Sequence, residues 1–217
     1  MKSFRVLLSI LLLAAGVRAA SALEYRLVAV DDGRCGFRGD CAAVVAATGE
    51  IGLDERDRFR SFVAALDGRA AAPQAFVIQS PGGNLAGAIQ LGMALRQIGV
   101  PVVAGRVVSG GIGRGFCGSA CVYVLMGGRS RRVSSGSVIA IHAPRRAAST
   151  WQGGVVDDGT PEGRRMVAQL LSEYSRLMGV DPALIALTMR TPHEGRRVLS
   201  SAEIRRYGLA TSLARHR

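Results

Sequence analysis

The chain has 217 residues, of which 48% are apolar and 20% charged, with 28 glycines. This composition is typical of one globular domain and excludes a disordered tail protein. A chain of this length buries about 70% of its unfolded surface, so it can fold without disulfides or a metal. The net charge is +12, and because Lys2 is the only lysine, every other Lys or Arg position is an arginine.

The first 22 residues have the pattern of an export signal. Two cations precede an apolar run over residues 6–17, and the small residues Ala20-Ser21-Ala22 follow, as a signal peptidase requires. At about 1.5 Å per residue, the run is too short to cross about 30 Å of hydrocarbon. We predict a signal peptide over residues 1–22, one domain over residues 23–217, and a periplasmic or secreted location; an uncleaved membrane anchor is the alternative.

Beyond this segment, short β-like apolar runs alternate with helix-like stretches, which is typical of an α/β domain. The predicted strands are residues 42–47, 75–79, 102–108 and 138–142, and the predicted helices are residues 54–66, 86–98, 119–126 and 162–178. Glycine-rich turns separate them, among them Pro81-Gly82-Gly83. No internal repeat or long linker divides the domain.

No Asp or Glu occurs between Asp67 and Asp157, whereas arginines are frequent there. A site in this stretch cannot use paired carboxylates, which disfavours glycosidase chemistry and carboxylate-bound magnesium or calcium. The cysteine spacings do not match zinc knuckles. Residues 113–118 fit the pattern GxGxxG, but no acid follows about 20 residues later to bind a ribose. We therefore predict no metal and no cofactor.

The acid-free stretch does contain candidates for nucleophilic catalysis. Ser119 follows a glycine-rich stretch and opens an apolar run, which would place its hydroxyl at a helix N-terminus, where N–H groups favour negative charge. His142 ends a predicted strand and could act as a base. The alternatives are that Ser119 only caps the helix and that His142 is an ordinary strand-end residue.

Gly82 and Gly83 follow the predicted strand at residues 75–79. Consecutive glycines let backbone N–H groups approach a substrate carbonyl closely, as an oxyanion hole requires. A plain tight turn into the next helix is the alternative.

Four motifs, taken together and in this order, resemble the proteolytic subunit of Clp protease and its ClpP/crotonase superfamily. They are residues 76–83 with the helix that follows, 118–128, 139–144, and 198–203 with 207–210. The resemblance covers about residues 44–213 and is closer still to exported bacterial Clp-like proteins that carry a cysteine pair around the serine. It implies an α/β fold, a ClpP/crotonase-like spiral of ββα units in a single domain.

Residue by residue, the resemblance implies Ser119 as nucleophile and His142 as the general base that removes its proton. It implies the N–H groups of Gly83 and Ala120 as oxyanion donors, with Gly82 shaping the turn, and each such donor is worth about 3 kcal/mol of barrier. The related signal peptide peptidase A matches less well, because it uses a lysine as base.

The family's third catalytic residue, an aspartate that orients the histidine, has no direct counterpart. Alignment from Ile185 places Thr188 there, and alignment from Leu199 places Pro192. Glu194 is the nearest acid but needs a shifted register. Loss of the acid can cost about 10⁴ in rate, unless a hydroxyl or a backbone carbonyl accepts the imidazole N–H.

Cys117 and Cys121 flank Ser119 and, on a helix, would share one face, whereas Cys35 and Cys41 enclose a short loop. Four cysteines allow three full connectivities, so pairing within the couples, across them, or not at all stays open. A structural staple is our default interpretation, and a redox role beside the serine is the alternative.

Two classes of function follow. The first is an exported, ATP-independent serine hydrolase, a peptidase acting on peptide or protein substrates without an ATPase partner, because that partner is cytosolic in the Clp family. The second is a non-catalytic binding or scaffold protein that keeps the fold. Export disfavours crotonase-like acyl-CoA chemistry, and an aromatic content of 5% without a basic helix disfavours nucleic-acid binding.

Two expectations concern partners. Oligomers are common in the superfamily, so a homo-oligomer through the helix at residues 162–178 is open. A cleft lined by arginine and free of acids would favour acidic ligands.

Overall fold

The computed structural model describes five parts of the chain, residues 22–30, 42–66, 73–109, 111–144 and 160–213. All of the predicted signal peptide except Ala22 lies outside these parts, as do Cys35 and Cys41. No helix within the five parts is long and apolar enough to cross a membrane.

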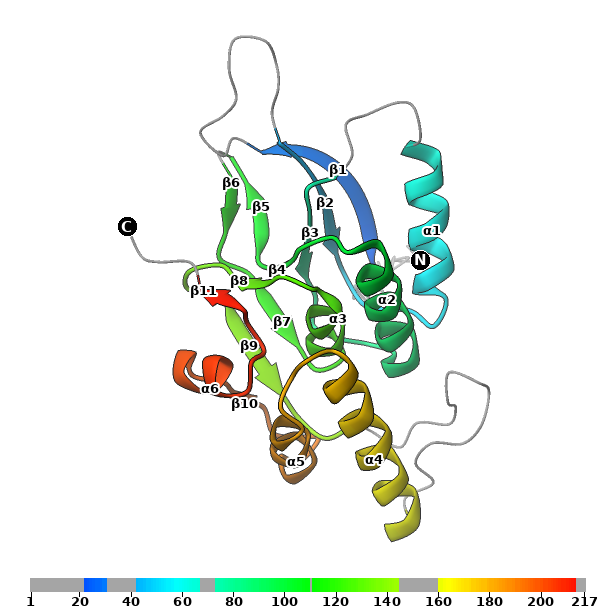
Figure 1. Ribbon diagram of the computed structural model, residues 1–217, viewed down its shortest axis with the longest axis vertical. Coiled ribbons are helices and arrows are strands. Elements are labelled where there is room, and N and C mark those ends of the chain that lie inside the picture. The colour runs from blue at the N-terminus through cyan, green and yellow to red at the C-terminus, as the bar shows by residue number, and fades with distance from the viewer. Residues whose placement is uncertain (1–21, 31–41, 67–72, 110, 145–159, 214–217) are drawn as a thin grey trace, which may run out of the picture.

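A six-stranded sheet with the order β1-β2-β3-β4-β8-β11 forms the largest layer (Figure 1). Only β1 runs antiparallel to its neighbour, and the other pairs are parallel. Parallel strands are covered on both faces and read as continuous apolar runs, as residues 75–78 do. The strands are β1 (Glu24–Val30), β2 (Ala42–Thr48), β3 (Ala75–Gln79), β4 (Val102–Ala104), β8 (Arg131–Val133) and β11 (Ser212–Leu213).

A smaller sheet with the order β10-β9-β7 continues from the end of β3. A single bridge joins the two sheets: the Ser80 N–H donates to the Phe116 carbonyl at 2.9 Å, and the Gly118 N–H donates to the Ser80 carbonyl at 3.0 Å. The turn that follows β3 is thereby held beside the residues that follow β7. The strands are β7 (Phe116–Gly118), β9 (Val138–Ile141) and β10 (Arg197–Val198), and a separate hairpin comprises β5 (Arg106–Val108) and β6 (Gly111–Gly113).

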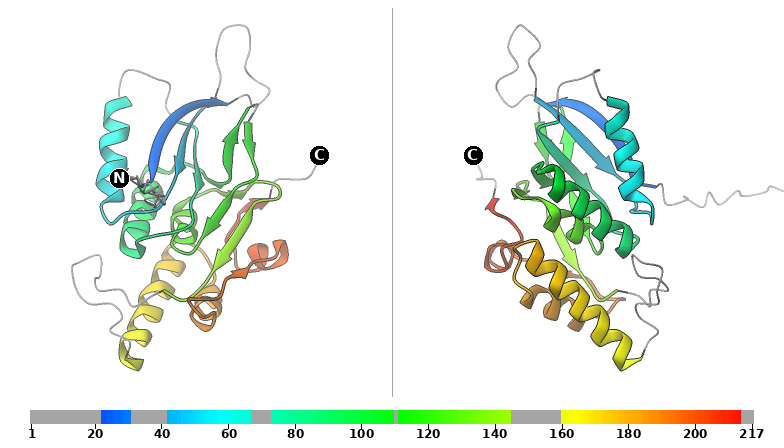
Figure 2. Two further views of the ribbon diagram at one scale, coloured as in Figure 1. Left: turned by 180° about the vertical axis from the view of Figure 1, so that it is seen from behind. Right: turned by 45° about the vertical axis from the view of Figure 1, so that its right-hand side comes forward.

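Helices cover the sheets at two levels. In all three views α1 and α2 lie beside the main sheet, and α4 and α5 lie at the end of the molecule opposite the β5–β6 hairpin (Figures 1 and 2). Helix α3 is buried along its whole length. The helices are α1 (Glu55–Leu66), α2 (Leu85–Ile98), α3 (Cys121–Gly127), α4 (Pro161–Leu177), α5 (Ala183–Arg190) and α6 (Ser201–Arg206).

The core lies between the main sheet and the helices α2 and α3. Its fully buried members include Phe76, Leu91 and Leu125. The two helices touch backbone to backbone, because a Cβ on Gly127 would lie 2.2 Å from the carbonyl oxygen of Gly92. This close contact fixes where α3, and the turn before it, stand relative to the sheet.

Arg131, in β8, is a buried cation that joins several elements. Its guanidinium donates to the carbonyls of Gly128 and Met178 at 2.9 Å, of Gly179 at 3.1 Å and of Gly208 at 2.9 Å. The ends of α3, α4 and α6 are thus tied to the sheet through one side chain.

The structure corrects two of the predicted elements. The expected strand at residues 102–108 is two strands in different sheets, β4 and β5. They part at Gly105, where a Cβ would lie 2.9 Å from the carbonyl oxygen of Gly113. The helix expected from Ser119 begins at Cys121. The other predicted helices and strands are confirmed to within a residue at their ends.

Candidate active site

Ser119 lies in the turn between β7 and α3. Its φ of 55° makes it the one non-glycine residue with positive φ in the described parts of the chain, a conformation that costs about 1–3 kcal/mol and clusters at functional sites. The Ser119 N–H donates to the carbonyl of Ala140 in β9 at 2.9 Å, and its carbonyl accepts the N–H of Val122 at 3.1 Å. The serine is therefore clamped between the small sheet and α3.

Ser119 does not cap α3, which was the alternative interpretation. The N-cap is Ala120, without a side-chain capping hydrogen bond. Ser119 instead lines a cavity of about 570 Å³.

A disulfide joins Cys117 to Cys121 across the serine turn, with a Cα–Cα distance of 5.3 Å. Cys117 is the middle residue of β7 and Cys121 is the first residue of α3, so the two cysteines do not share a helix. Both side chains are fully buried. The covalent link closes the segment that holds Ser119, as expected of a structural staple.

The diglycine bend after β3 packs against the serine turn. Gly82 and Gly83 have φ values of 116° and 132°. The Gly82 N–H donates to the hydroxyl oxygen of Ser80 at 3.1 Å, and its carbonyl accepts the N–H of Ile51 at 2.8 Å. A Cβ on Gly83 would lie 2.3 Å from the carbonyl oxygen of Ile51. Only glycine fits either position without displacing its neighbours.

Gly83 and Ala120 line the same cavity as Ser119. Neither N–H has an acceptor within the parts of the chain that the structure describes. Backbone N–H groups normally find a partner, so two amides beside one cavity are suited to bind an oxygen of a ligand.

The cavity brings four of the five predicted site residues together: Ser119, His142, Gly83 and Ala120 line it. Gly82 does not line the cavity but lies against Ser119. The other lining residues are Glu50, Pro81, Asn84, Leu85, Tyr123, Pro144, His193, Glu194 and Arg196.

His142 directly follows β9, which pairs in parallel with β7. Because Gly118 stands opposite Ala140 in this pairing, the serine turn and His142 leave the same edge of the small sheet. The Nδ1 atom of His142 lies 2.9 Å from the carbonyl oxygen of Ala143. A carbonyl oxygen only accepts, so Nδ1 carries the proton and Nε2 keeps the lone pair that a general base needs.

The candidates for a third catalytic residue lie in different places in the structure. Thr188 is buried in α5, where its hydroxyl donates to the carbonyl of Leu184 at 2.9 Å, and it does not line the cavity. Pro192 has no side-chain acceptor. Glu194 lines the cavity, as the shifted register required.

His193 is not among the residues predicted from the sequence. Its ring packs edge to face against His142, with centroids 4.5 Å apart and planes at 79°. It directly follows Pro192, one of the two positions at which alignment expects an aspartate. A histidine beside a missing acid is the signal that could have identified it.

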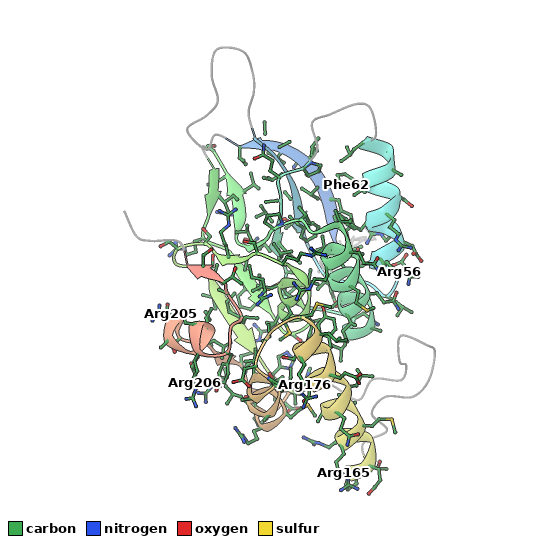
Figure 3. The ribbon with its side chains drawn as sticks, viewed as in Figure 1. Arg56, Phe62, Arg165, Arg176, Arg205 and Arg206 are labelled. Carbon is green, nitrogen blue, oxygen red and sulfur yellow. A yellow bond between two sulfur atoms is a disulfide. The ribbon has the colours of Figure 1, made fainter. Side chains whose placement is uncertain are left out.

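The charge of the cavity differs from the expectation of an arginine-lined cleft without acids. Of the described residues, Glu50 and Glu194 line it together with one arginine, Arg196. Four arginines that Figure 3 labels on α4 and α6 are exposed and are not among the residues that line the cavity: Arg165, Arg176, Arg205 and Arg206. Among the described residues, arginine therefore does not dominate the lining of the cavity. In the described residues, no group of three or more His, Cys, Asp or Glu could hold a metal ion.

No protein-family model and no curated protein matches the chain. Solved structures do. A serine-to-alanine mutant of the 1510-N membrane-bound stomatin-specific protease matches with a TM-score of 0.55 and 16% identity over 79% of this chain and 78% of that one. A lysine-to-alanine mutant of that protease, in complex with a substrate peptide, gives the same score and identity over 79% and 74%.

Two Clp-type structures match as well. ClpP1 from Listeria monocytogenes has a TM-score of 0.51 and 19% identity over 77% of this chain and 88% of that one. The ClpP protease catalytic domain from Plasmodium falciparum has a TM-score of 0.51 and 17% identity over 77% and 82%. The chain therefore has the ClpP/crotonase-like α/β fold that the sequence motifs predict, a fold that proteases use.

Proposed function

We propose that this protein is a serine hydrolase of the peptidase type, with Ser119 as nucleophile and His142 as general base. The observation that carries the proposal is the convergence on one cavity of Ser119, His142 and the amides of Gly83 and Ala120, which have no acceptor in the described parts of the chain. Nucleophile, base and oxyanion donors are the set that acyl transfer needs.

The chemistry follows from these positions. Nε2 of His142 removes the Ser119 proton as the hydroxyl oxygen attacks a peptide carbonyl. The N–H groups of Gly83 and Ala120 donate to the oxyanion that forms. The imidazolium then gives its proton to the leaving amine, and water releases the acyl group by the reverse route. When His142 is neutral, the carbonyl of Ala143 holds the proton on Nδ1, which leaves Nε2 as the base.

Peptides are the proposed substrates. A protease of similar fold binds a substrate peptide, and the cavity here, about 570 Å³ and open to solvent, can take several atoms of an extended chain. Because both charge signs line it, we propose no preference for acidic peptides.

Export and independence from ATP are part of the proposal. The apolar segment at residues 6–17 supports a signal peptide, and the disulfide between Cys117 and Cys121 supports an oxidising compartment such as the periplasm. No ATPase partner is expected in such a compartment.

A homo-oligomer through α4 is also proposed. This helix exposes Met166 at 56% and Leu177 at 70%, which are large apolar side chains for a surface helix. Analytical sedimentation of the wild type and of Leu177→Asp measures the oligomeric state. We expect the wild type to sediment as an oligomer and Leu177→Asp to dissociate, and a wild type that sediments as a monomer would contradict the proposed oligomer.

The alternative function is a non-catalytic binding protein, which is favoured because neither Thr188 nor Pro192, the two positions where alignment places the family's aspartate, is an acid. A fluorophosphonate probe decides between the two. We expect the wild type to be labelled, Ser119→Ala not at all, and His142→Ala at a rate lower by about 100-fold or more. Ser61→Ala, on the exposed side of α1, is the matched control and should label normally. Absence of labelling between about pH 6 and 9 would support the binding protein.

A further inference from the structure

The carbonyl oxygen of Ala143 is shared by two imidazole rings. It lies 2.9 Å from Nδ1 of His142 and 3.1 Å from Nδ1 of His193. A carbonyl oxygen has two lone pairs and no proton, so both rings donate to it and both carry their proton on Nδ1. One backbone acceptor thus sets the tautomer of both histidines.

The two rings also restrain each other. They pack edge to face, with centroids 4.5 Å apart. Nδ1 of His142 donates to the carbonyl of the next residue, so the direction of the ring depends on where that carbonyl is held. The donation from Nδ1 of His193 to the same carbonyl holds this acceptor in place, and with it the direction of Nε2 of His142; the ring contact adds to this constraint.

The loop that carries His193 is itself tied to Ala143. The Ala143 N–H donates to the carbonyl of Thr191 at 2.8 Å. The Gly195 N–H donates to the carbonyl of Pro192 at 3.1 Å, which closes the turn that presents His193. Ala143 is therefore bonded to the loop after α5 through both its N–H and its carbonyl, and the loop cannot shift without moving the residue next to His142.

We propose that His193 is a positioning residue for His142, and that with the carbonyl of Ala143 it takes the orienting part of the aspartate that the chain lacks. The inference rests on the proposed function of Ser119 and His142. His193 acts through His142 and not on the substrate. It orients the base without supplying a negative charge, which separates it from a carboxylate in the same position.

Three substitutions at His193 separate its two contacts. His193→Ala removes both the Nδ1 donor and the ring. His193→Phe keeps an aromatic edge against His142 but donates nothing to Ala143. His193→Asn places an amide N–H at the same number of bonds from the backbone as Nδ1, so it keeps the donor. Arg190→Ala, exposed at the end of α5, is the control on the neighbouring surface.

The first readout is the rate of fluorophosphonate labelling of the full chain. We expect His193→Ala and His193→Phe to slow labelling by about 10–100-fold, as loss of a residue that orients a functional histidine does. His193→Asn should recover most of the rate, and Arg190→Ala should not change it. Glu194→Gln tests whether the neighbouring carboxylate orients His142 instead. Slower labelling of Glu194→Gln, together with a normal labelling rate of His193→Ala, would assign the role to the carboxylate and overturn the inference.

The second readout does not depend on activity. The chain has three histidines, so their ring nitrogens can be assigned by substitution in two-bond ¹H–¹⁵N spectra. We expect the Nδ1–H tautomer for His142 in the wild type and in His193→Asn, and a mixture of tautomers in His193→Ala and His193→Phe. An unchanged His142 signal in all three variants would overturn the inference.

The two proposals can fail separately. If the wild type is not labelled, the hydrolase is wrong, and the His142 tautomer in the variants still decides whether His193 positions it. If the wild type is labelled and the His193 variants label equally fast, the hydrolase stands and the positioning role is wrong. Should His193→Ala not fold, the comparison of His193→Phe with His193→Asn decides in its place.

Discussion

A Cβ atom on Gly82 would lie 2.7 Å from the Cβ of Ser119 and 2.9 Å from the carbonyl oxygen of Gly118. The diglycine bend and the serine turn, separated by more than thirty residues in sequence, are therefore in direct contact. Any side chain at Gly82 must push the proposed nucleophile away from its place.

Gly82→Ala should slow probe labelling at least about 10-fold, because displacement of a reacting group by about 1 Å can cost up to 100-fold in rate. The matched control is Gly179→Ala. That glycine has a φ of 67° but nothing within 4 Å of the added Cβ. Gly179→Ala therefore has the conformational strain of a positive φ but no steric clash. Thermal unfolding of both variants would check that they fold. Wild-type labelling of Gly82→Ala would contradict the close contact.

Opening the disulfide should weaken both the fold and the site. In Cys117→Ala/Cys121→Ala the free energy of unfolding should fall by about 2 kcal/mol, the loop-closure contribution expected for so short a loop. Labelling should also slow, because the turn that holds Ser119 loses its covalent closure. Urea unfolding and probe kinetics measure the two effects.

Val122→Ala is the control for this variant, since Val122 is buried in α3 and its truncation removes apolar volume without opening the turn. It should lose stability and keep its labelling rate. Equal labelling by the double alanine variant and the wild type would show that the disulfide does not hold the serine.

Arg131→Met should lower the free energy of unfolding by about 3 kcal/mol or more, because four carbonyls lose their donor while the side chain stays long and apolar. Arg131→Lys should lose less, since an ammonium has three donors. Arg132→Met, one residue on and exposed, should change little. Urea midpoints measure all three, and an unchanged midpoint for Arg131→Met would refute the role of the guanidinium.

Stability should fall at alkaline pH. Burial raises the pKa of Tyr123 and of Tyr174 above their ordinary value of 10.0. Above that pH the unfolded chain releases protons that the folded chain keeps, so the free energy of unfolding decreases as pH rises, by about 1.4 kcal/mol per pH unit for each tyrosine. The stabilisation is complete below about pH 10.

Tyr123→Phe should reduce the decrease of the free energy of unfolding with pH by the contribution of one tyrosine, because the variant has one fewer proton to keep in the folded state. Urea unfolding at a series of pH values between about 9 and 11 measures the slope. The same slope in variant and wild type would show that Tyr123 ionises in the folded protein.

The elements around the site were predictable from local pattern. The strand at residues 75–79, the helix after the diglycine bend and the strand before His142 are apolar runs bounded by glycine, proline or polar turns, and the structure confirms all three. The strand at residues 102–108 was not predictable as two strands. Its break at Gly105 depends on the approach of Gly113 from β6, a contact that no local window of the sequence contains.

The sequence by itself determined which chemistry was open to the protein: a serine between two cysteines, a histidine after an apolar strand, a pair of glycines, and no lysine or acid nearby. Only the tertiary structure decided how the histidine is oriented. His193 meets the carbonyl of Ala143 across 50 residues of chain, through a loop held by α5, and that meeting depends on how the helix packs. The sequence gives the identity of each side chain directly, whereas contacts between segments far apart in the chain decide which side chains become its neighbours.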